Sequence, residues 1–162
     1  MKTILFACTR NSGRSQLAAS IFNALSSASM VRAVSAGTHP APSVQPEVVR
    51  ALKEIGIEAG GADPQLLTPE VAGRADKLIA LGCGEIPYLK TLPREDWELP
   101  DPSGQPLERV RQIRDHIQRR IWRLIAKEGW YKLRPIALLR LKPPQEGFRR
   151  SPPSPDSVAG AP

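Results

Sequence analysis

The chain has few cysteines, few aromatic residues and no long apolar run, and each shortage narrows the class of protein. Two cysteines among 162 residues, with no Cys-x-x-Cys pair, exclude a disulfide framework and a zinc ribbon and favour a reducing compartment. No segment approaches the roughly 18 apolar residues of a membrane span. The apolar run after Lys2 is too short for the core of a signal peptide. The composition predicts a soluble, cytoplasmic protein without a membrane partner.

A surplus of positive charge is unevenly distributed along the chain. The formal net charge is +7, and residues 129–162 contribute +4 of it through six basic and two acidic groups. Many of the other arginines lie in residues 109–123, where we interpret them as the solvated face of a helix. Because aromatic residues make up only 5% of the chain and no nucleic-acid-binding motif is present, we predict no nucleic-acid partner.

Length and pattern together predict the domain organisation. A chain of this length suits one domain with its own core, and apolar runs that alternate with helical periodicity predict a parallel α/β sheet. The expected strands are 3–7, 31–36, 76–81 and one around 97–99; the expected helices follow Ser15, Pro46 (with Gly56 as the C-terminal cap) and Thr68, and a long one spans about 106–127. We predict a domain at 1–128 and an extension at 129–162, disordered from 143 because that part is rich in proline and poor in apolar residues.

The segment between the first strand and the first helix is Cys8-Thr9-Arg10-Asn11-Ser12-Gly13-Arg14-Ser15. In such a loop the backbone N–H groups and the helix N-terminus face one point and can bind an anion. The guanidinium of Arg14 can hold two oxygens of a tetrahedral anion through its planar fork. The same positive field favours the reactive thiolate of Cys8. The pattern therefore predicts a thiolate nucleophile in an oxyanion-binding loop made of Thr9, Arg10, Asn11, Ser12, Gly13, Arg14 and Ser15.

This segment resembles the anion loop of the low-molecular-weight phosphatase superfamily, and it is most similar to the arsenate reductase branch. Other motifs that match this branch, in the same order along the chain, are Ser35-Ala36-Gly37-Thr38, Pro46-Glu47-Val48-Val49, Leu81-Gly82-Cys83-Gly84 and Trp97-Glu98-Leu99-Pro100-Asp101-Pro102. The resemblance covers about residues 3–127. It implies a single three-layer α/β domain: a four-stranded parallel sheet with the first strand central and helices on both faces.

The resemblance also implies a role for individual residues. Members of the family attack the central atom of a tetrahedral oxyanion with the loop cysteine, here Cys8, while the arginine, here Arg14, and the loop amides hold the oxygens. Asp101 would protonate the leaving oxygen, and a carboxyl beside a dianion and a thiolate favours its protonated form. Asn11 would hold the shape of the loop, and Ser15 would hydrogen-bond the sulfur.

The second chemical step separates two enzymes that share this first step. In a phosphatase, water attacks the cysteine adduct, whereas in an arsenate reductase a second thiol attacks the sulfur and leaves a disulfide and arsenite. Cys83, expected at the same edge of the sheet, is the candidate thiol, although a free cysteine beside a strand is often only a buried apolar residue. Ser103-Gly104 stand after Asp101-Pro102, where the tyrosine phosphatase branch typically has an aromatic residue. We predict an arsenate reductase; the alternative is a phosphatase acting on phosphotyrosine or small phosphoesters.

Two positions depart from the family pattern. Thioredoxin-coupled members have a further cysteine after the resolving one, and this chain has none between Cys83 and Asp101. Either a Cys8–Cys83 disulfide passes directly to an external reductant, or a small thiol or thiol-linked protein attacks the Cys8 adduct itself. The candidate reductants are thioredoxin, glutaredoxin with glutathione, and mycothiol. Arg10 stands where the family usually has histidine or glycine, and it either strengthens the anion field or points into solvent.

Two further interpretations carry less weight. His39 and His116 have no metal-ligand spacing, so we predict neither a metal nor another bound cofactor. A non-enzymatic protein with a degenerate anion loop, whose basic tail binds an acidic surface, is a different class of function. The presence of Cys8, Arg14, Ser15 and Asp101 together argues against that class, because a loop freed from catalysis has no chemical need for all four.

Overall fold

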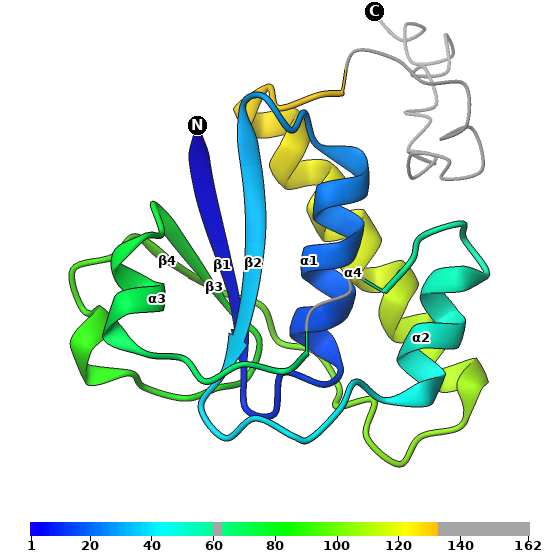
Figure 1. The fold of residues 1–162 in the computed structure, drawn as a ribbon. Coiled ribbons are helices and arrows are strands. Elements are labelled where there is room, and N and C mark those ends of the chain that lie inside the picture. The colour runs from blue at the N-terminus through cyan, green and yellow to red at the C-terminus, as the bar shows by residue number, and fades with distance from the viewer. Residues whose placement is uncertain (60–62, 133–162) are drawn as a thin grey trace, which may run out of the picture.

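The computed structural model describes residues 1–59 and 63–132 (Figure 1). Its elements are β1 (Lys2–Cys8), α1 (Arg14–Leu25), β2 (Val31–Gly37), α2 (Pro46–Lys53), α3 (Pro69–Gly73), β3 (Lys77–Ala80), the 3-10 helix η1 (Pro87–Leu89), β4 (Arg94–Asp96) and α4 (Leu107–Glu128). Helix α2 ends at Lys53 and its C-cap is Glu54, two residues before the predicted Gly56. Gly56 forms the left-handed turn that follows, with φ +76° and its N–H donating to the carbonyl of Lys53 at 3.0 Å. The predicted cap of α3 is confirmed, since the Thr68 side chain accepts from the N–H of Val71.

The four strands form one parallel sheet in the order β2-β1-β3-β4. β1 pairs with β2 over its whole length, so that Cys8 lies beside Gly37, and on its other side Ala7 lies beside Ala80 of β3. The first strand is therefore central, as the resemblance implied. Parallel strands bring their carboxyl ends to one edge, so the loops that follow β1, β2 and β3 share that edge.

The sheet separates two apolar layers (Figure 1). Helices α1, α2 and α4 pack on one face around a cluster that includes Phe6 and Phe22, whose ring centroids are 5.7 Å apart. The shorter α3 and η1 cover the other face, around a second cluster that includes Leu5 and Leu78. Leu5 and Phe6 are neighbours on β1 and point to opposite faces, because side chains alternate along a strand. The predicted three-layer α/β architecture is confirmed.

The fourth strand lies about three residues earlier than predicted. The sequence indicated a strand around 97–99, whereas β4 is Arg94–Asp96 and all three of its side chains are exposed. An exposed edge strand of charged residues has no apolar alternation to mark it. Trp97 follows directly and is 2% exposed. Its ring meets Phe6 edge-on, and its backbone N–H donates to the carbonyl of Ala80 at 2.9 Å. The apolar Trp97 therefore indicated a contact with the core, and the strand itself lies just before it.

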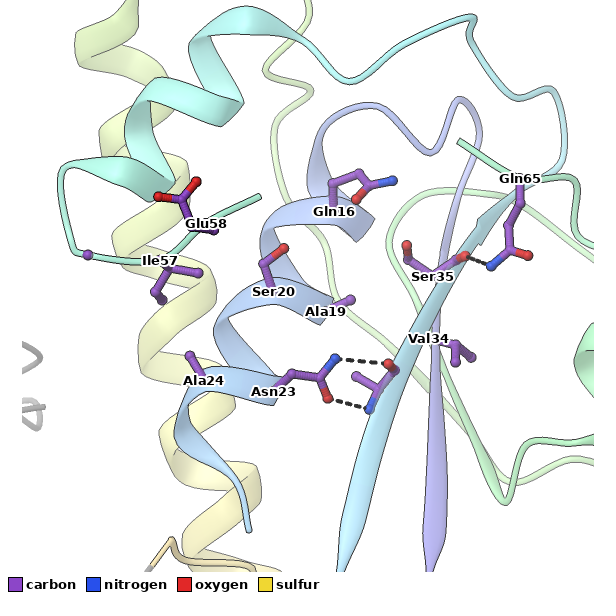
Figure 2. A pocket seen from close by; sticks show the side chains of 12 residues that line it. Gln16, Ala19, Ser20, Asn23, Ala24, Val34, Ser35, Ile57, Glu58 and Gln65 are labelled. Atoms are coloured by element: carbon purple, nitrogen blue, oxygen red, sulfur yellow. Dashed lines mark hydrogen bonds between the residues drawn. The ribbon is translucent and has the colours of Figure 1, made fainter. Parts of the chain in front are cut away.

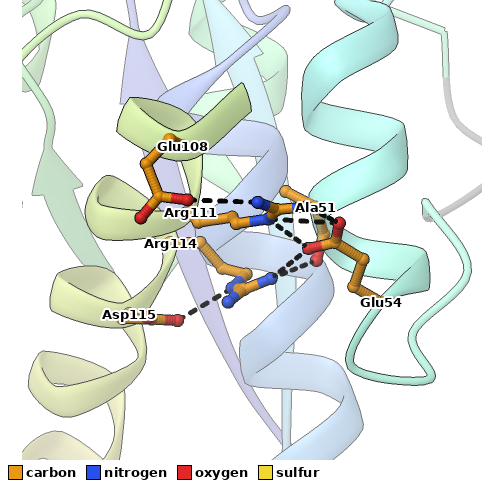
Figure 3. A network of polar contacts seen from close by, with 6 residues as sticks. All are labelled: Ala51, Glu54, Glu108, Arg111, Arg114 and Asp115. Carbon is orange, nitrogen blue, oxygen red and sulfur yellow. Dashed lines mark hydrogen bonds and ion pairs between the residues drawn. The ribbon is translucent and has the colours of Figure 1, made fainter. Parts of the chain in front are cut away.

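An ion-pair network ties α2 to α4 (Figure 3). Arg111 binds Glu54 through two nitrogens, at 2.9 Å and 2.6 Å. Arg114 donates to the carbonyl of Ala51 at 2.8 Å and to Glu54 at 3.1 Å. The expectation that the arginines of α4 form a solvated face is wrong for Arg114, which is 8% exposed. Its guanidinium is buried because it satisfies a carbonyl near the end of α2 as well as the Glu54 carboxylate.

The residues just beyond α4 fold back on the domain. The ring of Trp130 meets Phe22 edge-on at 6.1 Å, and its carbonyl accepts from the N–H of Ser27 at 3.0 Å. The predicted disorder from 143 lies outside the described residues, and the predicted boundary at 128 stays a prediction. Within residues 1–59 and 63–132, no helix is long and apolar enough to cross a membrane.

Candidate active site

Cys8 ends the central strand, and its sulfur is buried at the base of the loop that leads into α1. The sulfur accepts a hydrogen bond from the N–H of Asn11 at 3.2 Å and lies 2.8 Å from the hydroxyl oxygen of Ser15. The Ser15 hydroxyl in turn accepts from the side-chain amide of Asn11 at 2.8 Å, so it can donate its own proton to the sulfur. The sulfur thus has two hydrogen-bonding neighbours, one from the loop backbone and one from the start of α1. The structure therefore surrounds the predicted nucleophile as the sequence led us to expect.

The carbonyl oxygens of the loop are turned outward, and each meets a donor. The carbonyls of Cys8, Thr9 and Arg10 accept from the backbone N–H groups of Thr38, His39 and Ala41, respectively. The Asn11 carbonyl accepts from the side-chain amide of Gln16. The carbonyls of Ser12 and Gly13 accept from the backbone N–H groups of Gln45 and Leu17, and all six distances lie between 2.8 and 3.2 Å. A loop whose carbonyls point out leaves its N–H groups facing inward, next to the N-terminus of α1. The result is an electropositive cradle above the sulfur.

Most of these outer donors belong to the segment after β2, and the sequence did not predict their role. The two segments meet closely at Gly37, where a Cβ would lie 2.6 Å from the carbonyl oxygen of Thr9 and 2.8 Å from the nitrogen of Asn11. Only glycine fits there without moving the anion loop. The motif Ser35-Ala36-Gly37-Thr38 was the available signal, because it carried the family resemblance, but a spacing in sequence does not reveal a backbone contact.

Asn11 links the loop to a second support that the sequence did not reveal. It has a φ of +50°, a left-handed conformation that asparagine tolerates better than most residues. Its side-chain oxygen accepts from the N–H of Gln65 at 2.9 Å, while its amide nitrogen reaches Ser15. Gln65 is itself fixed, since its side chain donates to the carbonyl of Ser35 at 2.7 Å. Asn11 thus holds the loop between β2, the 63–67 segment and α1.

Arg14 and Asp101 face each other at the mouth of the cradle. Arg14 Nη1 donates to the carbonyl of Leu99 at 3.2 Å, and Arg14 Nη2 lies 3.9 Å from Asp101 Oδ2. The Arg14 side chain is 13% exposed, and that of Asp101 is 56% exposed. The other oxygen of Asp101 accepts from the N–H of Ser103 at 2.9 Å, which fixes the carboxylate in its turn. A carboxyl at the rim, with solvent on one side and the anion loop on the other, is placed to exchange a proton.

Cys83 lies on the neighbouring loop, after β3. The carbonyl of Gly82 accepts from the Thr9 hydroxyl at 3.3 Å, and a Cβ at Gly82 would lie 2.6 Å from Arg14 Nη1. The residue before Cys83 therefore touches the anion loop at two points. The Cys83 side chain is half-buried against the second apolar cluster, and this burial raises the pKa of its thiol, as does a negative charge on Cys8. The structure thus shows an apolar contact for Cys83 and also a position next to the Cys8 loop.

The remaining candidate residues lie around this centre. Ser12 is buried and accepts from the side chain of Gln45 at 3.3 Å, whereas Arg10 is exposed. His39 is exposed beside Thr38, and His116 lies on α4 beside Arg120. Burial and then the charges of neighbouring arginines lower the pKa of His116. In the described part of the chain, no three His, Cys, Asp or Glu side chains gather in a way that could hold a metal ion.

A cavity of about 460 Å³ lies behind the cradle, between α1 and β2 (Figure 2). Asn23 crosses it and exchanges two hydrogen bonds with the backbone of Ala33, at 3.0 Å and 2.7 Å. Gln16 and Gln65 line it and support Asn11 from behind. The described lining contains neither a thiol nor a cation, so we assign the chemistry to the Cys8 loop.

The fold and the site define a class: α/β proteins that hold a cysteine nucleophile in an anion-binding loop at the carboxyl edge of a parallel sheet. The sequence profile described as low molecular weight phosphotyrosine protein phosphatase matches residues 3–129. The chain belongs to this family, and the resemblance found in the sequence is confirmed.

Similar proteins include several named as arsenate reductases. A glutaredoxin arsenate reductase from Synechocystis is 35% identical over 131 residues, which cover 78% of this chain and 98% of the relative. A putative arsenate reductase from Halobacterium salinarum is 32% identical over 121 residues, which cover 72% of this chain and 85% of the relative.

Solved structures agree with this grouping. An arsenate reductase in a phosphate-binding state has a TM-score of 0.67 and 34% identity, over 78% of this chain and 98% of that one. A thioredoxin-dependent arsenate reductase from Corynebacterium glutamicum has a TM-score of 0.64 and 33% identity, over 79% of this chain and 63% of that one. An arginine phosphatase from Geobacillus stearothermophilus has a TM-score of 0.70 and 28% identity, over 80% of this chain and 94% of that one.

Proposed function

We propose that this protein is an arsenate reductase that releases arsenite with the help of an external thiol reductant. The observation that carries the proposal is the contact between the two cysteine-bearing loops, where the Thr9 hydroxyl bonds Gly82 one residue before Cys83. The similarity to proteins named as arsenate reductases supports arsenate as the substrate.

In the first step, the Cys8 thiolate attacks arsenic. The inward-facing loop amides and Arg14 hold the arsenate oxygens, and they do so in an arrangement that outer hydrogen bonds have already fixed. Such preorganised donors need not reorient when charge develops on the oxygens. Asp101 gives its proton to a hydroxyl group of hydrogen arsenate, which leaves as water: the arsenic–oxygen bond breaks as the sulfur–arsenic bond forms.

In the second step, Cys83 attacks the Cys8 sulfur of the adduct. A sulfur–sulfur bond forms, the sulfur–arsenic bond breaks, and its electron pair stays on arsenic, which leaves as arsenite. The two thiols are oxidised by two electrons and arsenate is reduced by two, while the proton of Cys83 ends on the departing oxyanion or in water. An external dithiol, or two small thiols, then reduces the Cys8–Cys83 disulfide.

The mouth of the cradle favours a small anion. Pro102 covers Gly13, where a Cβ would lie 2.7 Å from the proline ring, and Ser103-Gly104 follow without an aromatic side chain. An aryl phosphate gains much of its binding from an aromatic wall, which these residues do not supply. We also propose that the protein works in the cytoplasm, where reduced thiols persist.

The decisive experiment measures arsenite formation with thioredoxin, glutaredoxin plus glutathione, and mycothiol systems side by side. We expect repeated turnover with at least one system. When the reductant is omitted, each protein molecule should form no more than one arsenite. Hydrolysis of p-nitrophenyl phosphate is measured in parallel. Failure to form arsenite with every system, together with rapid ester hydrolysis, would overturn the proposal.

That outcome would instead support a second candidate, a low-molecular-weight phosphatase. Its first step is identical, with Cys8, Arg14 and Asp101 in the same roles, and water would attack the phosphocysteine. The similarity to the Geobacillus stearothermophilus arginine phosphatase favours this candidate. The Cys83 thiol, for which attack by water on a phosphocysteine has no use, argues for the reductase.

A further inference from the structure

Arg94 and Asp96 form a bidentate ion pair on the edge strand β4, next to the loop that carries Cys83. Arg94 Nε lies 2.9 Å from one carboxylate oxygen of Asp96, and Nη2 lies 2.6 Å from the other. The same Nη2 donates to the carbonyl oxygen of Gly84 at 2.9 Å. Asp96 therefore fixes the guanidinium, and the guanidinium fixes the backbone one residue beyond Cys83.

The strand register puts this pair on the same face of the sheet as the thiol. Arg94 pairs with Leu78 and Asp96 with Ala80, so the four side chains share one face. Leu78 and Ala80 belong to the apolar cluster against which Cys83 packs. The guanidinium and the thiol consequently approach the same corner of the molecule from two different elements.

The Cys83 loop needs such a support because its backbone is unusually free. Gly82 has a φ of +82° and Gly84 a φ of +70°, so left-handed glycines stand on both sides of the cysteine. Glycine loses the most conformational freedom when it is ordered, and a loop with two of them is easily displaced. At Gly84, a Cβ would meet nothing within 4 Å, so packing does not hold this residue. The hydrogen bond from Arg94 restrains Gly84 in place of packing contacts.

Charge acts on the thiol from the same side. Burial raises the pKa of Cys83, and the Arg94 cation opposes that effect. Two charged or titratable groups act on the Cys83 thiol, Arg94 of β4 and Cys8 of β1. Asp96 and Glu85 act in turn on Arg94. Helices α3 and η1 contribute the apolar Ala72 and Leu89 to the cluster against which Cys83 packs.

We propose that Arg94 is a positioning residue for Cys83: it holds the loop so that the thiol can reach the Cys8 sulfur, and it supports the thiolate that attacks. This inference rests on the proposed function, in which the Cys83 sulfur bonds to the Cys8 sulfur and the sulfur–arsenic bond breaks with its electron pair left on arsenic. The hydrogen bonds of Arg94 reach Asp96 and the Gly84 carbonyl, so it acts through the Cys83 loop and thiol and is not a catalytic residue itself.

The test compares Arg94→Gln with the wild type in single turnovers. Reduced protein is mixed with arsenate without reductant, and the Cys8–Cys83 disulfide is quantified by mass spectrometry from about pH 6 to pH 9. We expect R94Q to form the disulfide about tenfold more slowly near neutral pH, with its pH profile displaced to higher pH. The rate at which iodoacetamide alkylates Cys8 should stay at the wild-type value.

Three variants sharpen the result. Arg74→Gln changes an exposed arginine at the end of α3 on the same side of the sheet and should behave as the wild type. Arg94→Lys keeps the charge but not the fork, so its pH profile should stay near that of the wild type while disulfide formation remains several-fold slow. Asp96→Asn releases the guanidinium and should also slow the disulfide, which provides a test if R94Q does not fold.

A wild-type rate and profile in R94Q would overturn the inference, and so would an equal slowing of Cys8 alkylation, because that would mean general damage. Alkylation of Cys83 needs no arsenate. Its pH profile should move upward in R94Q even if arsenate proves not to be the substrate, so the failure of this inference and the failure of the proposed function give different results.

Discussion

The two cysteine-bearing loops at the carboxyl edge of the sheet are built in opposite ways. The Cys8 loop is buried, its carbonyl oxygens from residue 8 to residue 13 all have outer donors, and Asn11 fixes it from two sides. The Cys83 loop is mostly exposed, with only the cysteine half-buried; left-handed glycines stand on both sides of the thiol, and hydrogen bonds from Thr9 and Arg94 hold the loop. A rigid cradle suits the first step, in which charge develops at a fixed place. A lightly held loop suits the second step, in which one sulfur must approach another.

The largest effect should follow from Cys8→Ser. Serine is a far weaker nucleophile than a thiolate, so arsenite formation should fall below detection in the coupled assay. Binding of phosphate, measured by calorimetry, should persist because the amides and Arg14 remain in place. Retained turnover in this variant would show that the cradle does not carry the nucleophile.

Cys83→Ser should separate the two steps. Arsenite formation should fall by at least about tenfold, because no thiol of the chain remains to attack the adduct. Hydrolysis of p-nitrophenyl phosphate, if present in the wild type, should be unchanged. Unchanged arsenate reduction would instead show that an external thiol attacks the Cys8 adduct directly. The second step could then no longer be assigned to the Cys83 loop.

A matched pair of glycine variants tests the contrast between the rigid Cys8 loop and the more lightly held Cys83 loop. Gly37→Ala places a methyl group 2.6 Å from the Thr9 carbonyl oxygen, so the cradle must move, and both stability and alkylation of Cys8 should suffer. Gly84→Ala meets no neighbour within 4 Å, but its φ of +70° costs an alanine about 1 kcal/mol. It should slow disulfide formation and leave Cys8 alkylation unchanged. The reverse assignment of these effects would contradict the account.

Glu54→Gln tests a region remote from both loops. Hydrogen bonds from Arg111 are the main cause that lowers the pKa of Glu54 from its ordinary value of 4.5. A carboxyl with a lowered folded-state pKa stabilises the fold above its unfolded pKa, and this contribution is lost as the pH falls through the folded value. The melting temperature of the wild type should therefore fall more steeply below about pH 4.5 than that of E54Q, as measured by circular dichroism. Both catalytic steps should be unaffected near neutral pH.

The smallest effect is expected from deletion of residues 143–162. Their composition predicts no packed core, so neither the melting temperature nor the arsenite rate should change noticeably. A substantial drop in either quantity would mean that this segment docks on the domain.

The sequence predicted those features that side-chain type and spacing determine. The strands with continuous apolar runs, the buried face of α4 and the loop between β1 and α1 that joins Cys8 to Arg14 all belong to this group. It misplaced β4, because an exposed edge strand of charged residues shows no alternation. It could not reveal that Gly37 and Gln65 support the cradle. Gly37 contributes a close backbone approach, and Gln65 contributes a backbone N–H, which every residue except proline carries. The link from Arg94 to Gly84 was hidden for the same reason, because its acceptor is a main-chain carbonyl.

The most direct test of the central claim asks what attacks Cys8. Fully reduced protein is mixed with a small excess of arsenate in the absence of any reductant, quenched with acid and analysed by peptide mapping and arsenic speciation. The account predicts one arsenite per protein molecule and a disulfide between Cys8 and Cys83, with both thiols lost together. Free Cys83 and no arsenite until an external thiol is added would contradict it.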